Sequence, residues 1–393
     1  MTSQPSPPMP ILYLDHAPIW GGAEAVLVTL LQNLDRRRFQ PFVGTAPQSP
    51  LAQRLENSDV AVLTVPFDTL NQAGWRLPFN LAKSVTAVSR LIRQHHIALV
   101  HTNTVRAHIV GSLAGWLTRT PVIWTLHDNT LPLRLARLLS PIPRQVIAVS
   151  GWLRDLYQPQ GLIGKCRVIP NGLPMIERGD PLPSIRGELG IPPDAPLVLN
   201  VGRLIAGKAP HLFVAAAESA AAQHPAAHFV LVGGPDAGEA ADTAYLDRLS
   251  HSIANSPLGP RLHAVGPRQD VNRFYQAADV VVYSAAQPEG LPTVLLEAMA
   301  YAKPVVASAI GGALEIVVDG ATGLLVPANE AGALAGAMHA LLGDAAAKTK
   351  MGQAGHERLR QTFSVEGQVK HTTALYQSVL FPNRNLESPK PNA

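Results

Sequence analysis

Short apolar runs alternate with amphipathic stretches along the first half of the chain. The runs are rich in Val, Ile and Leu, and they predict strands at residues 11–14, 60–65, 98–101, 122–126 and 146–149. Residues 23–34 and 81–94 place apolar side chains three and four positions apart, which predicts helices between strands. Because the runs are continuously apolar rather than alternating, we expect a parallel sheet with helices on both faces.

The same alternation restarts after a proline-rich segment, residues 170–196, which we interpret as an interdomain linker. Strands are predicted at residues 197–201, 229–233, 262–265, 280–283 and 305–308, with a helix between each pair. The final helical stretches, 331–342, 345–362 and 365–380, have no strand partner. The predicted fold class is therefore α/β, with two Rossmann-like doubly wound domains facing across a cleft.

The expected boundaries give an N-terminal domain at residues 1–180 and a C-terminal domain at residues 181–365. Residues 366–393 would begin with a helix that packs back on the N-terminal domain and end in a disordered polar tail. Two domains suit a chain of 393 residues, because single cores stop growing near about 250–300 residues. Ligands of such folds bind beyond the carboxyl ends of the strands, so the site residues should follow strands.

Composition narrows the class of protein. The single cysteine, Cys166, has no partner within the chain for a disulfide, and residues 1–10 lack the pattern of a secretory signal. No apolar run reaches the roughly 18 residues needed to span a bilayer. We therefore expect a cytoplasmic protein.

The net charge of +4 is too mild to indicate a nucleic-acid partner, and no dense basic tract is interleaved with aromatic residues. Basic residues gather at 36–38, 90–93 and 134–144. Solvated helix faces are the simpler interpretation of these groups. The alternative is a surface for anionic lipid, and the basic amphipathic stretch 131–144 is its best candidate, at the inner face of the membrane.

Two glycine-containing loops are suited to phosphate. Gly21 and Gly22 follow the first strand and open a helix whose amides favour negative charge, although paired glycines are more often ordinary turn residues. Arg203 and Lys208 lie on the loop after the strand at 197–201. An arginine makes two hydrogen bonds to phosphate and a lysine adds a point charge, so this pair suits a diphosphate; solvent-facing loop residues are the competing interpretation.

The strongest signal is the segment from Glu289 to Glu297, directly after the strand at 280–283. Its turn leads into a helix near Thr293, whose first amides are free to bind phosphate. Glu297 lies one turn inside that helix, where it is able to accept from ribose hydroxyls, and Glu289 in the loop is able to meet sugar hydroxyls. Because the helix is apolar nearly all round, a carboxylate there needs a partner.

At these residues the chain resembles the retaining glycosyltransferases of the GT-B fold, family 4, also called glycosyl transferases group 1. The C-terminal half carries an ordered series of matching motifs, residues 200–204 with Lys208, 231–235, 289–300, 303–307, 311–312 with Glu315, and 319–323. The N-terminal match is sparser and comprises residues 21–24, His127 with Asp128, Ser150 and residues 168–172.

The resemblance implies that Arg203 and Lys208 bind the diphosphate of a nucleotide sugar and that Glu297 holds its ribose. It further implies that Glu289 positions the transferred sugar, that Gly22 contacts phosphate from the other domain, and that His127 lies near the sugar and the acceptor. The backbone that would assist Glu289 comprises Gly290, Leu291, Pro292 and Thr293. His127, Glu289, Arg203 and Lys208 are the residues expected to serve catalysis.

The chain departs from the family pattern at two places. Ala209 follows Lys208 where the family usually has glycine. The run His101-Thr102-Asn103 replaces a more usual histidine pair on the acceptor side. Asn103, His127 and Asp128 are therefore the expected acceptor residues, and they are the least constrained part of the site.

The expected reaction is transfer of a hexosyl-type sugar, with retention of configuration, from a nucleotide-diphosphate sugar to a glycan or lipid-linked acceptor. UDP is preferred over GDP as the donor nucleotide, and the product would serve cell-surface polysaccharide or glycolipid synthesis. No metal and no cofactor are expected, because two cations are able to replace a divalent ion. A nucleotide-sugar epimerase of the same fold and a non-catalytic two-domain binding protein remain alternatives.

Overall fold

The computed structural model describes residues 7–67, 77–162, 164–176, 183–235 and 243–382. The chain divides into two compact units: unit 1 comprises residues 1–172 and 365–393, and unit 2 comprises residues 173–364. The expected boundary between residues 180 and 181, and the polar tail beyond residue 382, lie outside the described residues. Within those residues, no helix is both long and apolar enough to cross a bilayer.

Unit 1 is built on a parallel sheet, for which the described residues give the order β3-β2-β1-β4-β5-β6-β7. Its strands are β1 (Met9–Leu14), β2 (Phe39–Thr45), β3 (Ala61–Thr64), β4 (Leu99–Thr102), β5 (Val122–Leu126), β6 (Gln145–Ala148) and β7 (Cys166–Val168). Its helices are α1 (Gly22–Gln32), α2 (Pro50–Leu55), α3 (Leu77–Gln94), α4 (Val105–Thr118), α5 (Leu133–Leu139), α6 (Gly151–Tyr157), η2 (Gln158–Gln160) and α15 (Val365–Leu380).

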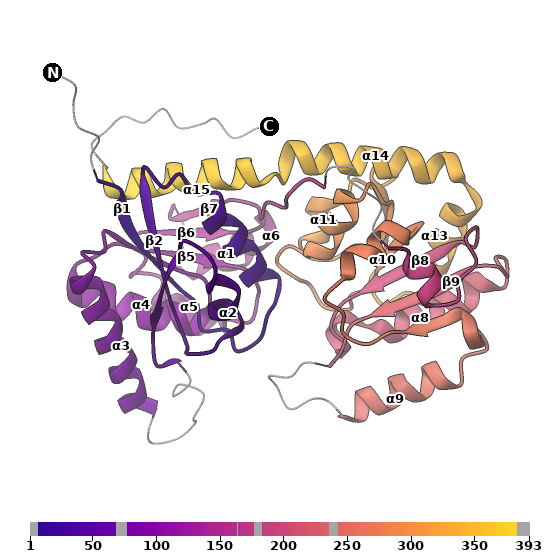
Figure 1. Cartoon of the computed structure of the whole chain (residues 1–393), viewed down its shortest axis with the longest axis horizontal. Coiled ribbons are helices and arrows are strands. Elements are labelled where there is room, and N and C mark those ends of the chain that lie inside the picture. The colour runs from indigo at the N-terminus through magenta and orange to yellow at the C-terminus, as the bar shows by residue number, and fades with distance from the viewer. Residues whose placement is uncertain (1–6, 68–76, 163, 177–182, 236–242, 383–393) are drawn as a thin grey trace. The chain divides into compact units, whose positions relative to one another are not determined.

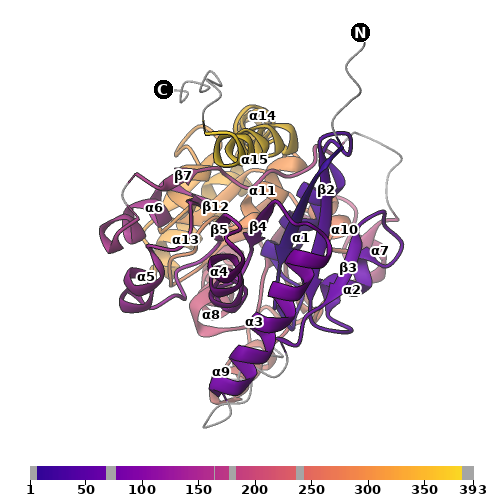
Figure 2. The same cartoon turned by 90° about the vertical axis from the view of Figure 1, so that its left-hand side faces the viewer.

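Alternate residues of β1 enter two different cores. Ile11 and Tyr13 pack with side chains of α1, α2 and α15, whereas Leu12 and Leu14 pack with side chains of α3 and α4. Figure 2 shows the resulting layers, with α15 and α4 on opposite sides of β4 and β5. Burial on both faces explains why the strands are continuously apolar in the sequence.

Unit 2 repeats the plan with the strand order β10-β9-β8-β11-β12-β13 in its described residues. Its strands are β8 (Leu197–Val201), β9 (His228–Val232), β10 (Leu262–Ala264), β11 (Val280–Tyr283), β12 (Val305–Ser308) and β13 (Gly323–Val326). Its helices are α7 (Ile185–Glu188), η3 (Ala206–Lys208), α8 (Pro210–Ala221), α9 (Thr243–Ala254), η4 (Gly259–Arg261), α10 (Val271–Ala277), α11 (Thr293–Ala300), α12 (Ala313–Ile316), α13 (Ala331–Gly343) and α14 (Ala345–Thr362). Figure 1 shows both units, and helices α8 and α13 share a core with β8, β9 and β11.

Both sheets have a point at which the strand order reverses direction. In unit 1 this point lies between β1 and β4, and in unit 2 it lies between β8 and β11. The loops that leave neighbouring strands there diverge to opposite faces, which opens a crevice at the carboxyl edge of the sheet. The two Rossmann-like units of the predicted α/β fold are confirmed, and the described strands of each sheet contain one such reversal point.

Candidate active site

A lysine, a tyrosine and a glutamate meet at the reversal point of the unit 2 sheet. Lys208, at the end of η3, donates from Nζ to Oε2 of Glu289. Tyr283, the last residue of β11, donates from its hydroxyl to Oε1 of Glu289 at 2.6 Å. The ammonium also lies 5.9 Å from the centre of the Tyr283 ring. Both oxygens of Glu289 are therefore held by donors, and the ammonium of Lys208 is fixed where its charge acts on Glu297 of α11.

The loops that carry this cluster are tied to each other by the backbone. The carbonyl of Gly207 accepts from the amides of Ala286 at 3.0 Å and Gln287 at 3.1 Å. The hydroxyl of Ser284 donates to the carbonyls of Lys208 and Ala209, each at 3.2 Å. These contacts fix the position of Lys208 relative to the loop that leads to Glu289.

Gly311 and Gly312 support the other side of the Glu289 loop. The amide of Gly312 donates to the carbonyl of Glu289 at 2.9 Å. A Cβ on Gly312 would lie 2.0 Å from the carbonyl oxygen of Gly290, and Gly311 adopts a φ of 57° in the left-handed region. Only glycine allows this approach, so the paired glycines define the path of the backbone that enters α11.

Glu297 lies one turn inside α11 and has the partner that its burial requires. The hydroxyl of Tyr275 donates to its Oε2 at 2.7 Å. Burial raises the pKa of Glu297, while hydrogen bonds from Tyr275 and Thr293 and the charge of Lys208 oppose that rise. The carboxylate is thus oriented by donors and keeps acceptor capacity for a ligand.

The remaining predicted residues of unit 2 lie around this cluster. Pro292 is the residue preceding the first helical residue of α11, Thr293, and no side chain caps that helix end. Gly290 and Leu291, which precede Pro292 in the chain, are buried. Arg203 is exposed on the loop after β8. The structure therefore brings Lys208 and Glu289 into contact and leaves Arg203 on the surface of the same edge.

A second cluster lies at the reversal point of the unit 1 sheet. Asp15 follows β1, Asn103 follows β4 and His127 follows β5. Asn103 donates from Nδ2 to Oδ2 of Asp15 at 2.7 Å, and its Oδ1 lies 2.7 Å from Nε2 of His127. The amide of Ala17 donates to Oδ1 of Asp15 at 2.8 Å. Two of the predicted acceptor residues, Asn103 and His127, are therefore joined in a row that begins at a buried carboxylate.

Burial shifts the protonation of this second cluster. Desolvation lowers the pKa of His127 to about 4, although the charge of Asp128 opposes the shift. Burial also raises the pKa of Asp15, against the hydrogen bonds that it accepts from Asn103 and Ala17. His127 is consequently a neutral imidazole at neutral pH. Among the described residues, its Nδ1 is buried and has no hydrogen-bond partner.

The other predicted residues of unit 1 are engaged locally. Gly22 is the first residue of α1, but the carboxyl group of Glu24 accepts from the amides of Gly21 and of Glu24 itself. Burial and the neighbouring Asp15 raise the pKa of Glu24 to about 8. Asp128 accepts from the amide of Thr130 at 2.9 Å and from its hydroxyl at 2.6 Å. A carboxyl group therefore already occupies the amino end of α1 that the sequence assigned to phosphate.

Sequence reasoning missed the residues that orient the predicted ones. Tyr283 and Tyr275 hold the two glutamates, and Asp15 holds Asn103. A signal existed for two of them, because Tyr283 ends a strand and Asp15 directly follows one, at the edge where ligands bind. Tyr275 lies within α10, and nothing in its sequence position pointed to Glu297.

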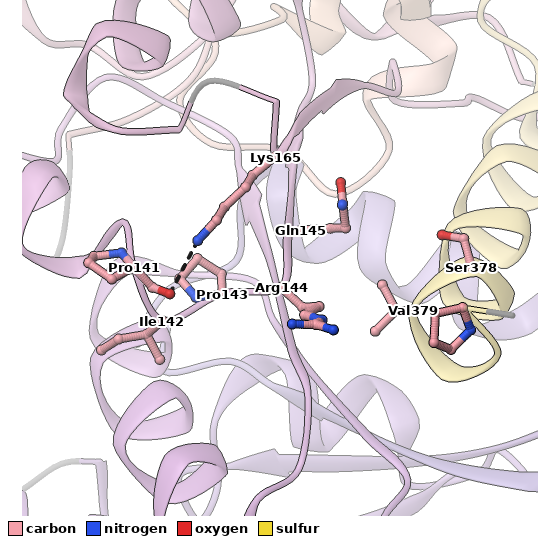
Figure 3. Close-up of a pocket in the computed structure, with 9 residues that line it drawn as sticks. Pro141, Ile142, Pro143, Arg144, Gln145, Lys165, Ser378 and Val379 are labelled. Carbon is pink, nitrogen blue, oxygen red and sulfur yellow. Dashed lines mark hydrogen bonds between the residues drawn. The ribbon is translucent and has the colours of Figure 1, made fainter.

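A pocket of about 400 Å³ lies elsewhere in unit 1 (Figure 3). Gln145, which begins β6, and Lys165, which precedes β7, line it together with Ser378 and Val379 of α15. Lys165 donates from Nζ to the carbonyl of Pro141 at 3.2 Å. Residues at the start of parallel strands lie at the edge opposite to their carboxyl ends, so this pocket is separate from the cluster at Asp15.

Comparison with known protein families accounts for both units. Residues 20–175 match the model described as Glycosyltransferase Family 4, and residues 183–358 match the model described as Glycosyl transferases group 1. The second match includes Lys208, Glu289 and Glu297. The first includes Asn103 and His127.

Relatives extend the match over most of the chain. A D-inositol 3-phosphate glycosyltransferase of Geodermatophilus obscurus is 30% identical over 91% of this chain and 84% of its own length. An alpha-maltose-1-phosphate synthase of Mycolicibacterium smegmatis is 32% identical over 72% of this chain and 79% of its own length. The crystal structure of Anabaena HepE in complex with UDP-glucose superposes with a TM-score of 0.81 at 27% identity, and it covers 94% of this chain and 100% of that chain. With family models matching both units and relatives aligned along nearly the whole sequence, the chain belongs to the family 4 glycosyltransferases of the GT-B fold.

Proposed function

We propose that this glycosyltransferase moves a hexosyl-type sugar from a UDP-sugar to an acceptor hydroxyl with retention of anomeric configuration. The observation that carries the proposal is the cation of Lys208, which is fixed on Glu289 in the loop that leads into α11 and acts on Glu297 of that helix. The N-cap residue of α11, Pro292, makes no side-chain cap hydrogen bond. A diphosphate group binds where an ammonium and free helix amides converge, because both stabilise its negative charge. Arg203, on the same loop as Lys208, adds a guanidinium to that edge.

The two glutamates are proposed to bind the ribose and the transferred sugar of the nucleotide sugar. Glu297, oriented by Tyr275 at 2.7 Å, accepts from the ribose hydroxyls. Glu289 accepts from hydroxyls of the transferred sugar, in exchange for one of its present donors. The backbone of Gly290, Leu291, Pro292 and Thr293 supplies amides and shape at the same place.

The choice of UDP over GDP rests on similarity. HepE of Anabaena, at 27% identity over 94% of this chain, has been crystallised with UDP-glucose. Like that protein, this chain is proposed to bind a uridine nucleotide, and a hexose is the simplest sugar that fits the comparison.

In the proposed reaction the bond between C1 of the sugar and the diphosphate oxygen breaks, and the diphosphate leaves with the electron pair. The acceptor oxygen forms its bond to C1 on the face that the diphosphate left, and its proton passes to the departing phosphate oxygen. Lys208 and Arg203 stabilise the negative charge that develops, so the proposal requires neither a metal nor a cofactor. Gly22, at the start of α1, remains a proposed phosphate contact, now in competition with Glu24.

The acceptor is proposed to be a glycan or a lipid-linked sugar, bound by residues of unit 1. His127 and Asn103 present polar atoms at the carboxyl edge of that sheet. Asp128 is a weaker candidate as a base, because Thr130 already donates to its carboxylate twice. We place the reaction in cell-surface polysaccharide or glycolipid synthesis, in the cytoplasm.

Contact with the inner face of an anionic membrane is a second proposal, and α5 supports it. Leu133 and Leu138 of this helix are 42% and 72% exposed, although both are large and apolar. Arg134 and Arg137 are exposed on the same short helix. An exposed combination of leucine and arginine suits an interface where apolar groups enter the acyl boundary and cations meet headgroups. Flotation with vesicles containing phosphatidylglycerol tests it: loss of binding in Leu138→Ser supports the proposal, and absence of wild-type binding at low salt refutes it.

The transfer itself is tested by incubating the protein with UDP-glucose, UDP-galactose, UDP-N-acetylglucosamine and GDP-mannose, each with a panel of sugar and polyprenyl-phosphate acceptors. We expect acceptor-dependent release of UDP and a product whose anomeric proton coupling matches that of the donor, unchanged by EDTA. Epimerised donor without transfer would favour an epimerase. Tight UDP binding without turnover on any acceptor would favour a binding protein, and inversion or EDTA sensitivity would refute the corresponding part of the proposal.

A further inference from the structure

The hydrogen bonds that join Asp15, Asn103 and His127 in a row determine which ring nitrogen of His127 carries a proton. They do so because each contact allows only one direction of donation. The hydrogen bonds to Asp15 from Ala17 and Asn103 favour its ionised form against the effect of burial, and an ionised carboxylate only accepts hydrogen bonds. A primary amide has one donating and one accepting end. Asp15 uses both oxygens: Oδ1 accepts from the amide of Ala17 at 2.8 Å, and Oδ2 faces Asn103 at 2.7 Å. The end of Asn103 that faces Asp15 must therefore be the donating Nδ2.

With Asp15 ionised, electrostatic repulsion excludes the opposite orientation of Asn103. Its Oδ1 would then face Oδ2 of Asp15 at 2.7 Å, and two acceptors at that separation repel each other. The orientation fixed by Asp15 leaves Oδ1 facing Nε2 of His127, also at 2.7 Å. Because an amide oxygen donates nothing, the proton in this contact belongs to Nε2 of His127.

A neutral imidazole carries one N–H, so the other nitrogen of His127 is left with a lone pair. That nitrogen, Nδ1, is buried and without a partner among the residues that the structure describes. His127, Asn103, His101 and Thr125 line a small cavity of about 20 Å³, which has room for one hydroxyl or water oxygen. The neighbouring His101 is fully engaged, since its two ring nitrogens each lie 2.6 Å from a hydroxyl oxygen, of Tyr376 and Thr125.

We propose that Asp15 and Asn103 are positioning residues that hold His127 in the Nε2–H tautomer, so that Nδ1 accepts a hydrogen bond from a substrate hydroxyl. The role of His127 toward substrate rests on the proposed glycosyl transfer, whereas the tautomer depends on the fold of unit 1 alone. Asn103 belongs to the run that departs from the family resemblance, and Asp15 belongs to no motif of that resemblance.

The substitution Asp15→Asn tests the direction of hydrogen-bond donation along the row. The amide of Ala17 requires an acceptor, so the new side chain must direct its oxygen there and its NH₂ toward Asn103. Asn103 then satisfies that NH₂ only by turning its own amide, which presents Nδ2 to His127. Nε2 of His127 becomes the acceptor, and the proton moves to Nδ1.

The tautomer is measured by two-bond ¹H–¹⁵N correlation spectra of the full chain labelled with ¹⁵N-histidine at pH 7.5, with the His127 signals assigned by their loss in His127→Gln. We expect the wild-type protein to show a protonated Nε2 and an unprotonated Nδ1, and Asp15→Asn to show the reverse. The signals of His108, a buried histidine bonded to Thr102 and Ser112, serve as an internal control. Glu24→Gln, which removes an acidic neighbour of Asp15 without touching the row, should leave the tautomer unchanged.

A second variant covers the case in which Asp15→Asn fails to fold. Asn103→Leu removes the acceptor facing Nε2, and both tautomers of His127 should then be populated. A wild-type His127 that carries its proton on Nδ1, or a tautomer that neither substitution changes, overturns the proposal. These outcomes do not depend on turnover, so they stand apart from any failure to detect sugar transfer.

Where sugar transfer is measurable, kcat provides a separate test of the role of Nδ1. Asp15→Asn should lower kcat by about tenfold to a hundredfold, because a donor then faces a substrate donor. UDP affinity should stay within twofold, since the predicted nucleotide-binding residues of unit 2 are untouched. An unchanged kcat in a protein whose tautomer has inverted would overturn the role of Nδ1 while leaving the tautomer assignment intact.

Discussion

The contact between Lys208 and Glu289 predicts a specific pattern of energetic coupling in donor binding. The two side chains are only 20% and 28% exposed, so water screens them incompletely. Lys208→Met removes the charged hydrogen bond that we propose between Lys208 and the diphosphate, and such a bond is worth about 1.5–3 kcal/mol. It also leaves the carboxylate of Glu289 with Tyr283 as its remaining described donor, beside an anionic ligand. We therefore expect UDP affinity to fall at least about tenfold.

Neutralising the carboxylate in the same protein should recover part of that loss. In Lys208→Met with Glu289→Gln, the repulsion between carboxylate and diphosphate is gone, so UDP should bind more tightly than to Lys208→Met alone. The expected recovery is about 0.5–3 kcal/mol, the usual range for residues in contact. Additive losses would show that the pair is not coupled to the ligand.

The assay is isothermal titration of UDP at fixed ionic strength, with urea unfolding of each variant as a check of folding. Lys350→Met provides a matched control, because Lys350 is exposed on α14 and is also a lysine of unit 2. Wild-type affinity in folded Lys208→Met would refute the assignment of the donor diphosphate to this edge of the sheet.

Three further predictions concern stability. Gly312→Ala should lower the free energy of urea unfolding by about 1–3 kcal/mol and weaken UDP binding, because the new Cβ would lie 2.0 Å from the Gly290 carbonyl oxygen. The control Gly336→Ala, in open space on α13, should be neutral or stabilising. Equal effects of the two substitutions would refute the packing argument. Tyr376→Phe should cost about 1–3 kcal/mol, since it leaves Nδ1 of the buried His101 without its hydroxyl partner at 2.6 Å; a urea midpoint equal to that of wild type would contradict this. Burial lowers the pKa of His108 from 6.5 to about 3, so the stabilising contribution of the neutral imidazole is complete above pH 6.5 and declines as the pH falls toward 3. His108→Leu should therefore reduce the slope of unfolding free energy against pH by about 1.4 kcal/mol per pH unit in this range. An unchanged slope between pH 7 and 5 would exclude the pKa shift.

Most strands were predictable because burial on both faces leaves uninterrupted apolar runs. Residues 122–126, 197–201, 280–283 and 305–308 match strands of the structure at both ends. Strands without such runs were missed. β2 (Phe39–Thr45) contains Gln40, Pro41 and Gly44, which are residues typical of turns rather than of strands. The segment is a strand because it pairs with β1 on one side and β3 on the other.

The contacts within the site required the topology. Asp15 and Asn103 are 88 residues apart in the chain, and they meet because β1 and β4 are neighbours in the sheet. The strand order is a property of the tertiary fold, and no local sequence pattern reports it. The spacing of Glu289 and Glu297 was visible in the sequence. Their hydrogen-bond partners, Tyr283 and Tyr275, became identifiable only from the folded structure.

The place of α15 in the core of unit 1 has a consequence for biosynthesis. Leu375 and Tyr376 pack against Ile11, Tyr13 and Phe39, so β1 and β2 wait for a helix that is synthesised only after the whole of unit 2. Unit 2, a continuous segment from residue 173 to 364, has no such requirement and is expected to close first on the ribosome. Until α15 emerges, the nascent chain would expose the part of the sheet face of unit 1 that α1 and α2 leave to α15, and apolar surface of this kind is what chaperones bind.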